Sequence, residues 1–217
     1  MISLNGHKWS YKFGWIGQNK TLTRPEIKVF EAEAPLYDGV SAAPISPDSR
    51  YSTVYEINFS GFGCVGKLND DFDSLKECKS LFLTLNAISG EIPLTFSALT
   101  NLEYVSLSSN AFSGSIQPKV LSNWSKIREL DLSFNKLSGA IPNVFNCNTK
   151  LAELNISGNK LTGELPDSLS CLVHLKTLKL YSNGLEGSLP AWLECMVHLT
   201  DLNMSRNKYV MHRLLRY

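Results

Sequence analysis

An asparagine recurs in this chain at a nearly constant interval. The successive steps are 24, 25, 24, 24 and 24 residues, and they connect Asn86, Asn110, Asn135, Asn159, Asn183 and Asn207. The surrounding residues repeat as well: IRELDLSFNKLSGAIP (127–142) reappears as LAELNISGNKLTGELP (151–166) and as LKTLKLYSNGLEGSLP (175–190). A fixed period of this length is the signature of a solenoid, in which no repeat can bury its apolar face alone. The sequence therefore predicts one elongated array of repeats.

Within each repeat, the residue types indicate which part of the turn they build. The LxxLxL segment is typical of a short strand whose alternating leucines point inward. Parallel strands lie about 4.8 Å apart, so seven of them predict a ladder roughly 29 Å long. The asparagine needs hydrogen-bond partners when buried, and carbonyl groups of its own and the adjacent turn can accept its amide hydrogens. Glycine permits a backbone conformation that a side chain opposes, and proline ends strand pairing because it has no N–H.

The template divides the chain into three parts. Residues 54–207 form the solenoid, about seven repeats with the last one incomplete, and Phe62 of the degraded first repeat stands where asparagine is expected. Residues 1–53 are predicted to form an N-terminal cap, with a short helix at 23–34, because the first repeat would otherwise expose an apolar end. Residues 208–217 are interpreted as a C-terminal tail or a truncated cap. The extra residue of the 25-residue step is placed at Gln117, on the convex side.

The run LxxLxLxxNxLSGxIPxxLxxL resembles the plant-type leucine-rich repeat, and it recurs six or seven times over about 54–207. The resemblance implies a right-handed curved solenoid of the α/β type with a parallel β-sheet on its concave face. The region before the first strand is similar to the amino-terminal cap of that family in Tyr37 and Gly39-Val40, but it has no cysteine pair. Members of the family include ectodomains of receptor-like kinases and receptor-like proteins, and soluble inhibitors of cell-wall-degrading enzymes.

The concave face is the predicted binding surface, and it presents the third, fifth and seventh residues of each repeat. The seventh residue is nearly always serine or threonine, with Tyr181 as the exception, and Leu85 and Phe134 add exposed apolar area at the eighth position. Aromatic anchors beside charged groups are typical of interface hot spots. The candidate ligand-binding residues chosen on this basis are Phe82, Tyr104, Glu129, Asp131, Phe134, Glu153, Asn155, Lys179, Tyr181 and Asp201. The alternative interpretation is that they are ordinary solvated residues of exposed strands.

Other features exclude whole classes of function. The balance of 21 basic and 20 acidic residues, a net charge of +1, gives no reason to expect nucleic acid or an acidic membrane as partner. No apolar run is long enough for a transmembrane segment, and no catalytic motif or cofactor-binding motif is present. Cys147, Cys171 and Cys195 lie 24 residues apart, so we expect them to pack inward as small apolar side chains rather than to form a disulfide. The spacing C-x-x-H occurs twice, at Cys171–His174 and at Cys195–His198. The 24-residue period explains this recurrence, so we infer no metal site from it.

These observations predict a non-enzymatic recognition module. It would be the leucine-rich-repeat domain of a cell-surface, receptor-like protein that binds a peptide, protein or glycan and signals through a partner such as a co-receptor. A soluble inhibitor of secreted hydrolases remains an alternative. An intracellular scaffold is another, and the free cysteines and the absence of a signal-peptide-like segment at the N-terminus favour it. If the chain is extracellular, five N-x-S/T sequons are potential glycosylation sites: Asn19, Asn58, Asn123, Asn155 and Asn203.

Overall fold

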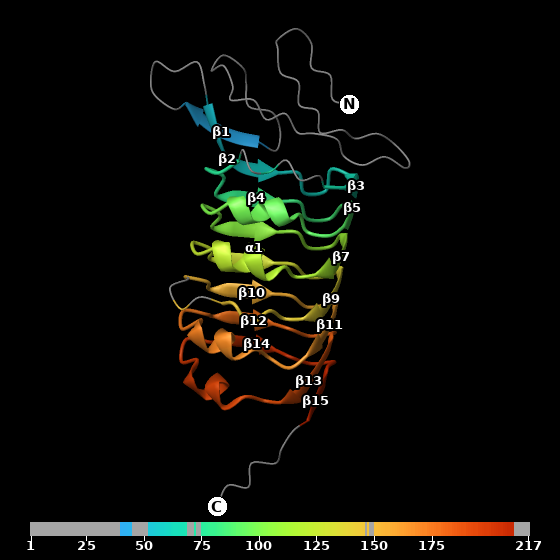
Figure 1. The fold of residues 1–217 in the computed structure, drawn as a ribbon, viewed down its shortest axis with the longest axis vertical. Helices are drawn as coiled ribbons and strands as arrows, with labels where there is room; N and C mark the ends of the chain where they lie inside the picture. Colours follow the sequence, from blue (N-terminus) through green and yellow to red (C-terminus); the bar gives the residue numbers. More distant parts are fainter. Residues whose placement is uncertain are drawn as a thin grey trace, which may run out of the picture.

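The computed structural model describes residues 40–44, 52–68, 72, 75–145, 147 and 150–210. The helix expected at 23–34, most of the expected cap and the end of the chain lie outside these residues. The described part is a stack of repeats along one long axis, with two sheets running the length of the stack (Figure 1). The predicted repeat solenoid is thereby confirmed.

The first sheet is built from the LxxLxL segments, one strand per repeat. In the described residues it has eight strands, in the order β1-β2-β4-β6-β8-β10-β12-β14. β1 (Val40–Pro44) pairs antiparallel with β2 (Ser52–Asn58), and every later pair is parallel with a register of one repeat. The later strands are β4 (Ser80–Phe82), β6 (Tyr104–Ser106), β8 (Glu129–Asp131), β10 (Glu153–Asn155), β12 (Thr177–Lys179) and β14 (Asp201–Asn203).

The segments around the Ser-Gly step form a second parallel sheet, which the sequence analysis did not anticipate. Seven described strands follow one another in it: β3 (Val65–Lys67), β5 (Ala87–Gly90), β7 (Ala111–Ser115), β9 (Lys136–Ala140), β11 (Lys160–Gly163), β13 (Gly184–Ser188) and β15 (Lys208–Val210). The glycine bends each strand: Gly139, for example, has a φ of +78°, which a side chain would oppose. The sequence did carry a weak signal for this strand, because an apolar leucine stands between polar residues in KLSGA.

Short helices return the chain on the convex side. Three of those in the described ranges are 3₁₀-helices, η1 (Leu94–Ala98), η2 (Asp167–Cys171) and η3 (Ala191–Cys195), and each follows directly after a proline. The repeat with the 25-residue step has instead the α-helix α1 (Pro118–Asn123), which begins immediately after Gln117. Proline suits these positions because its missing N–H would have no partner in the first turn of a helix. The extra residue therefore belongs to the repeat that has an α-helix where the others named here have a 3₁₀-helix.

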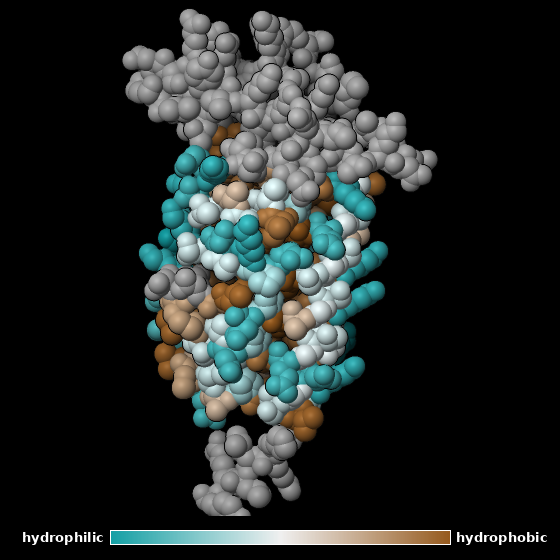
Figure 2. Space-filling model, in the orientation of Figure 1, coloured by the Kyte–Doolittle hydropathy of each residue, from teal (hydrophilic) through white to brown (hydrophobic). Residues whose placement is uncertain are grey.

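The interior between the two sheets and the helices holds the repeating apolar residues. In the fourth repeat, Leu130, Leu132, Leu137 and Ile141 are all buried. Trp124 is buried as well, and its Nε1–H donates to the carbonyl oxygen of Phe96 at 3.0 Å. On the side shown in Figure 2, hydrophobic residues are scattered among hydrophilic ones over the described part of the chain. In the part of the chain that the structure describes, no helix has the length and apolar character to cross a membrane.

The asparagine column connects each repeat to its neighbours. The Nδ2 group of Asn159 donates to the carbonyl oxygens of Leu132 (3.0 Å), Ile156 (3.1 Å) and Ser157 (3.2 Å). Its Oδ1 accepts the backbone N–H of Leu137 at 3.0 Å. The same four-bond pattern recurs at Asn86, Asn110, Asn135, Asn183 and Asn207. Each asparagine thus bonds to the preceding repeat through both ends of its amide.

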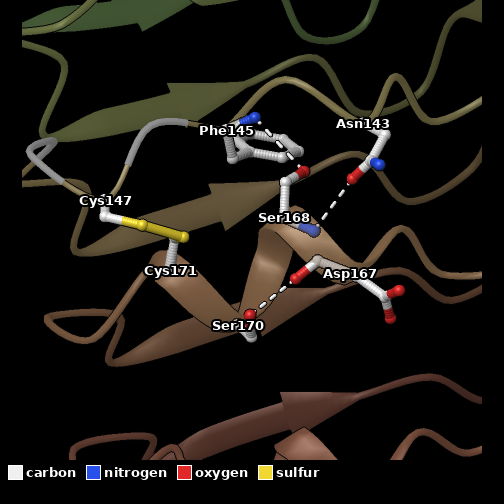
Figure 3. Close-up of a disulfide and its surroundings, with 7 residues drawn as sticks. All are labelled: Asn143, Phe145, Cys147, Asp167, Ser168, Ser170 and Cys171. Atoms are coloured by element: carbon white, nitrogen blue, oxygen red, sulfur yellow. Dashed lines mark hydrogen bonds between the residues drawn. A yellow bond between two sulfur atoms is a disulfide. The ribbon is translucent and has the colours of Figure 1, made fainter.

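The expectation for the three spaced cysteines is wrong. Cys147 and Cys171 form a disulfide between adjacent repeats (Figure 3). Cys195 is an exposed free thiol. The physical reason is the end of each 3₁₀-helix. Cys171 is the last residue of η2 and Cys195 the last residue of η3, and in each repeat it is the following residue, Leu172 or Met196, that is buried in the core. Beside the disulfide, Asn143 accepts the backbone N–H of Ser168 at 2.9 Å, so the loop before Cys147 is held against η2.

Candidate binding face

The outward surface of β4 to β14 is called the concave face below, and the strands fix which side chains point out from it. Because residues alternate along a strand, Leu130 and Leu154 point inward while their neighbours point outward. Glu129 and Glu153 are exposed, and they are directly paired in register on adjacent strands. Asp131 and Asn155 form the next outward pair. The central strands therefore bring four of the candidate residues into one block.

The seventh position differs from the sequence expectation. Ser108, Ser133 and Ser157 are buried, with 5%, 2% and 0% of their surface exposed. The reason is that the next residue adopts a left-handed backbone conformation, as in Phe134 with a φ of +53°. This turn directs the eighth side chain outward and leaves the small serine between stacked repeats. Only Tyr181, which is too large for this space, reaches the surface from the seventh position in the central repeats.

Two of the outward polar side chains are partly committed to these turns. Asp131 Oδ1 accepts the backbone N–H of Ser133 at 2.9 Å. Asn155 Oδ1 accepts both the backbone N–H (3.2 Å) and the hydroxyl (2.7 Å) of Ser157. These local bonds satisfy buried donors that face the strand end. A substitution at either position must therefore keep an acceptor if the turn is to be preserved.

The charges on this face are not balanced locally. Lys179 forms an ion pair with Asp201 (Nζ to Oδ2, 3.3 Å), so two of the candidate residues neutralise each other. Arg128, just before β8, pairs with Glu103 at 2.8 Å. Neither of these two ion pairs between described residues includes Glu129 or Glu153. The pKa of Glu129 is raised, first by desolvation of its carboxyl group and then by the neighbouring charge of Glu153.

An aromatic pair spans the fourth to sixth repeats. The rings of Phe134 and Tyr181 meet edge to face, with centroids 6.2 Å apart and an interplanar angle of 68°. They belong to repeats that are not adjacent, and Gly158 stands in the repeat between them. A Cβ on Gly158 would lie 2.8 Å from Cδ1 of Phe134, so the missing side chain is what allows the ring to lie there. Sequence reasoning selected both aromatic residues but missed the role of this glycine.

The remaining apolar candidates lie nearer the N-terminal end of the face. Phe82 and Tyr104 are on adjacent strands and are offset by two residues in register, since Ser80 pairs with Tyr104 and Phe82 pairs with Ser106. Both side chains are half-buried. Leu85, at the eighth position of the same repeat as Phe82, is 66% exposed. These residues extend the apolar part of the face but are separate from the Phe134–Tyr181 pair.

The sequons and the C-x-x-H segments occupy different surfaces. Asn155 and Asn203 lie on the concave face, and Asn58 ends β2, the strand next to that face. Asn123 instead ends α1 and donates to the carbonyl oxygen of Ser97 at 2.9 Å. Asn19 is outside the described residues. His174 and His198 are exposed near η2 and η3. Within the described ranges, no group of three or more histidine, cysteine or acidic side chains is arranged to hold a metal ion.

Comparison with known proteins agrees with this architecture. The family described as leucine rich repeat matches residues 113–161, and a second leucine-rich-repeat description matches residues 174–196. Receptor-like protein 41 of Arabidopsis thaliana is 36% identical over 77 residues, which cover 35% of this chain and 8% of that protein. This chain spans between 8% and 11% of the length of the curated receptor-like proteins that it matches.

Solved structures show the same likeness in three dimensions. The PEPR1–AtPEP1 structure is similar with a TM-score of 0.72 and 31% identity, over 79% of this chain and 23% of that one. The Arabidopsis receptor kinase HAESA, in complex with the peptide hormone IDA and the co-receptor SERK1, is similar with a TM-score of 0.62 and 32% identity, over 67% of this chain and 24% of that one. The matched repeats, the two parallel sheets and these likenesses show that the chain is built from leucine-rich repeats of the plant type.

Proposed function

We propose that this chain is a non-enzymatic recognition module of a receptor-like protein, and that it binds an extended peptide through its concave face. The single observation that carries the proposal is the contrast on that face between fixed and free positions. Inward leucines and the asparagine column build the second to seventh repeats alike, whereas Glu129, Glu153 and Phe134 stand exposed where the repeat does not constrain them. Free, chemically varied positions on a rigid sheet are what a recognition surface requires.

The similarity to receptor ectodomains supports the same conclusion. HAESA, which shares the fold, is a receptor kinase solved with a peptide hormone and a co-receptor. By analogy, this chain would act at the cell surface and transmit the binding event through a co-receptor or another partner. An analogy of fold supports the class of function, whereas the particular site must be tested through its own residues.

A direct test selects peptides and then removes the charges of the site. A phage-displayed library of random 12-residue peptides is panned against the whole chain, and each selected peptide is measured against E129Q/D131N/E153Q. The amide replacements keep an acceptor for the Ser133 N–H, which alanine at position 131 would remove. We expect affinities to fall about tenfold or more, since two or three charge contacts are lost, while the melting temperature stays nearly unchanged.

The matched control removes the same number of charges from elsewhere. E91Q/E164Q/E186Q changes three exposed carboxylates in the segments that build the second sheet, and it should leave binding as in the wild type. Peptides that bind the concave-face variant as tightly as the wild type would contradict the assignment of the site. A loss of affinity in the control variant alone would transfer the site to the second sheet.

Glycosylation gives a second check on the surface. A glycan on Asn155 would stand in the centre of the block formed by β8 and β10. Intact-mass analysis of natively expressed protein, before and after glycosidase treatment, shows whether this sequon is occupied. Occupancy would establish passage through the secretory pathway and would move peptide binding to an edge of the face or to its N-terminal aromatic end.

A further inference from the structure

The concave face has two chemically different parts at a fixed separation, and this separation limits what can bind. One part is the pair of carboxylates at Glu129 and Glu153, and the other is the aromatic pair of Phe134 and Tyr181. The first lies at the third position of its repeats and the second at the seventh and eighth. Beyond the end of β8 the backbone stays hydrogen-bonded to the next repeat through the N–H groups of Leu132 and Phe134. Four to five residues of extended chain therefore place the two parts about 13–16 Å apart.

The acidic part favours a cation over any other partner group. Glu129 and Glu153 lie side by side in register, an arrangement that costs free energy through repulsion. On this face Lys179 is already paired with Asp201 at 3.3 Å, and Arg128, just before β8, is paired with Glu103. The chain as a whole has a net charge of +1, so the negative character belongs to this place and not to the whole molecule. An incoming lysine or arginine side chain would relieve the repulsion.

The aromatic part favours an apolar side chain. Phe134 leaves 51% of its surface exposed although it rests over Gly158 and contacts Tyr181. Large exposed apolar side chains that lie together on a sheet indicate a surface that is covered in a complex. The edge-to-face arrangement leaves ring surface open on which another aromatic or aliphatic group can pack.

We infer that the partner is a peptide segment that carries a basic side chain and an apolar side chain four residues apart. In an extended peptide, residues i and i+4 point to the same side and are about 13 Å apart, which matches the distance between the two parts of the face. The basic side chain binds between Glu129 and Glu153, and the apolar side chain packs on Phe134 and Tyr181. This inference depends on the proposed function, because it assigns chemistry to the same face.

The test uses short synthetic peptides of defined spacing. Acetyl-Arg-Ser-Ser-Ser-Phe-amide and its reverse, acetyl-Phe-Ser-Ser-Ser-Arg-amide, cover both chain directions. Acetyl-Arg-Phe-Ser-Ser-Ser-amide keeps the composition and changes the spacing, and acetyl-Glu-Ser-Ser-Ser-Phe-amide reverses the charge. Titrations of the whole chain followed by NMR chemical shifts measure each dissociation constant. We expect one of the two spaced peptides to bind at least about fivefold more tightly than the peptides with changed spacing or charge.

Variants of the two parts then separate their roles. E129Q/E153Q should remove the preference for arginine over glutamate, whereas F134S should weaken the binding of the spaced peptides and leave that preference unchanged. Equal affinity of all four peptides, or an unchanged arginine preference in E129Q/E153Q, would overturn the inference. The proposed function would survive that result if library-selected peptides of another composition still depended on the concave face, and it would fail if no selected peptide did.

Discussion

At the scale of single residues, the absence of one side chain shapes the centre of the concave face. Gly158 has a φ of +64°, and the ring of Phe134 occupies the space above it. Gly163 has a similar φ of +79°, but a Cβ there would meet only the Cβ of Ala140, at an ordinary 3.7 Å. The two glycines therefore share a backbone requirement and differ in what lies over them.

This difference gives a paired prediction. G158A and G163A should each lower the free energy of unfolding by about 1 kcal/mol, because alanine disfavours a positive φ. Only G158A should move the Phe134 ring away from Tyr181, since the added methyl group takes the place of the ring edge. Urea denaturation measures the first effect, and the NMR shifts of the Tyr181 ring protons measure the second. Identical Tyr181 shifts in the wild type and G158A would show that the glycine does not position the ring.

At the scale of elements, the 3₁₀-helices decide the chemistry of the cysteines. Cys171 ends η2 and bonds to Cys147, whereas Cys195 ends η3 and remains exposed. Cys64 and Cys78 are buried in the first repeats, and desolvation raises the pKa of their thiols to about 11 and about 12. Since the thiolate is the reactive form, burial and a raised pKa both suppress the reactivity of these two residues.

Thiol labelling checks this arrangement. In the native, unreduced protein at neutral pH, a maleimide should react rapidly with one cysteine, Cys195, and the variant C195S should show no rapid reaction. Mild reduction should raise the number of rapidly labelled cysteines to three by freeing Cys147 and Cys171. Mass spectrometry of the labelled peptides identifies the sites. Rapid labelling of three cysteines without reduction would show that the disulfide is absent.

At the scale of the whole molecule, stability is carried by contacts between neighbouring repeats. Apart from contacts such as that of Phe134 with Tyr181, the repeats of a solenoid touch only their neighbours, so its free energy is approximately a sum of repeat and interface terms. The asparagine column contributes to every interface, because each amide bonds to the preceding repeat as well as to its own turn. An interior repeat is held by neighbours on both sides, whereas a repeat at the end of the array has one neighbour and can unfold locally without the others.

We therefore predict that the same substitution has a larger effect in the middle of the array than at its end. N159A should lower the free energy of unfolding by about 3 kcal/mol, because it leaves several buried carbonyl oxygens and one N–H without partners. N207A removes an equivalent set of bonds in the last described repeat, but it should cost about 1 kcal/mol because that repeat opens locally at low cost. Urea denaturation measures both values. Equal losses would show that the array unfolds as a single unit.

The sequence by itself determined the repeat, its strands and its turns. These follow from interactions within 24 residues, since alternating leucines, a turn asparagine and a Ser-Gly step dictate the same local backbone in each copy. The first-sheet strands of Glu129 and Glu153 were therefore placed correctly from the period. The residues at freely varying positions could be named for the same reason, because they are the places that the template leaves open.

Only the tertiary structure decided how the repeats meet. The second sheet, the burial of Ser157, the contact between Phe134 and Tyr181 and the Cys147–Cys171 bond all join different repeats. They depend on the direction in which each side chain leaves its turn and on what stands in the next repeat, such as the missing side chain of Gly158. A linear pattern records the residues of one repeat in order, whereas these contacts arise from the stacking of repeats in space.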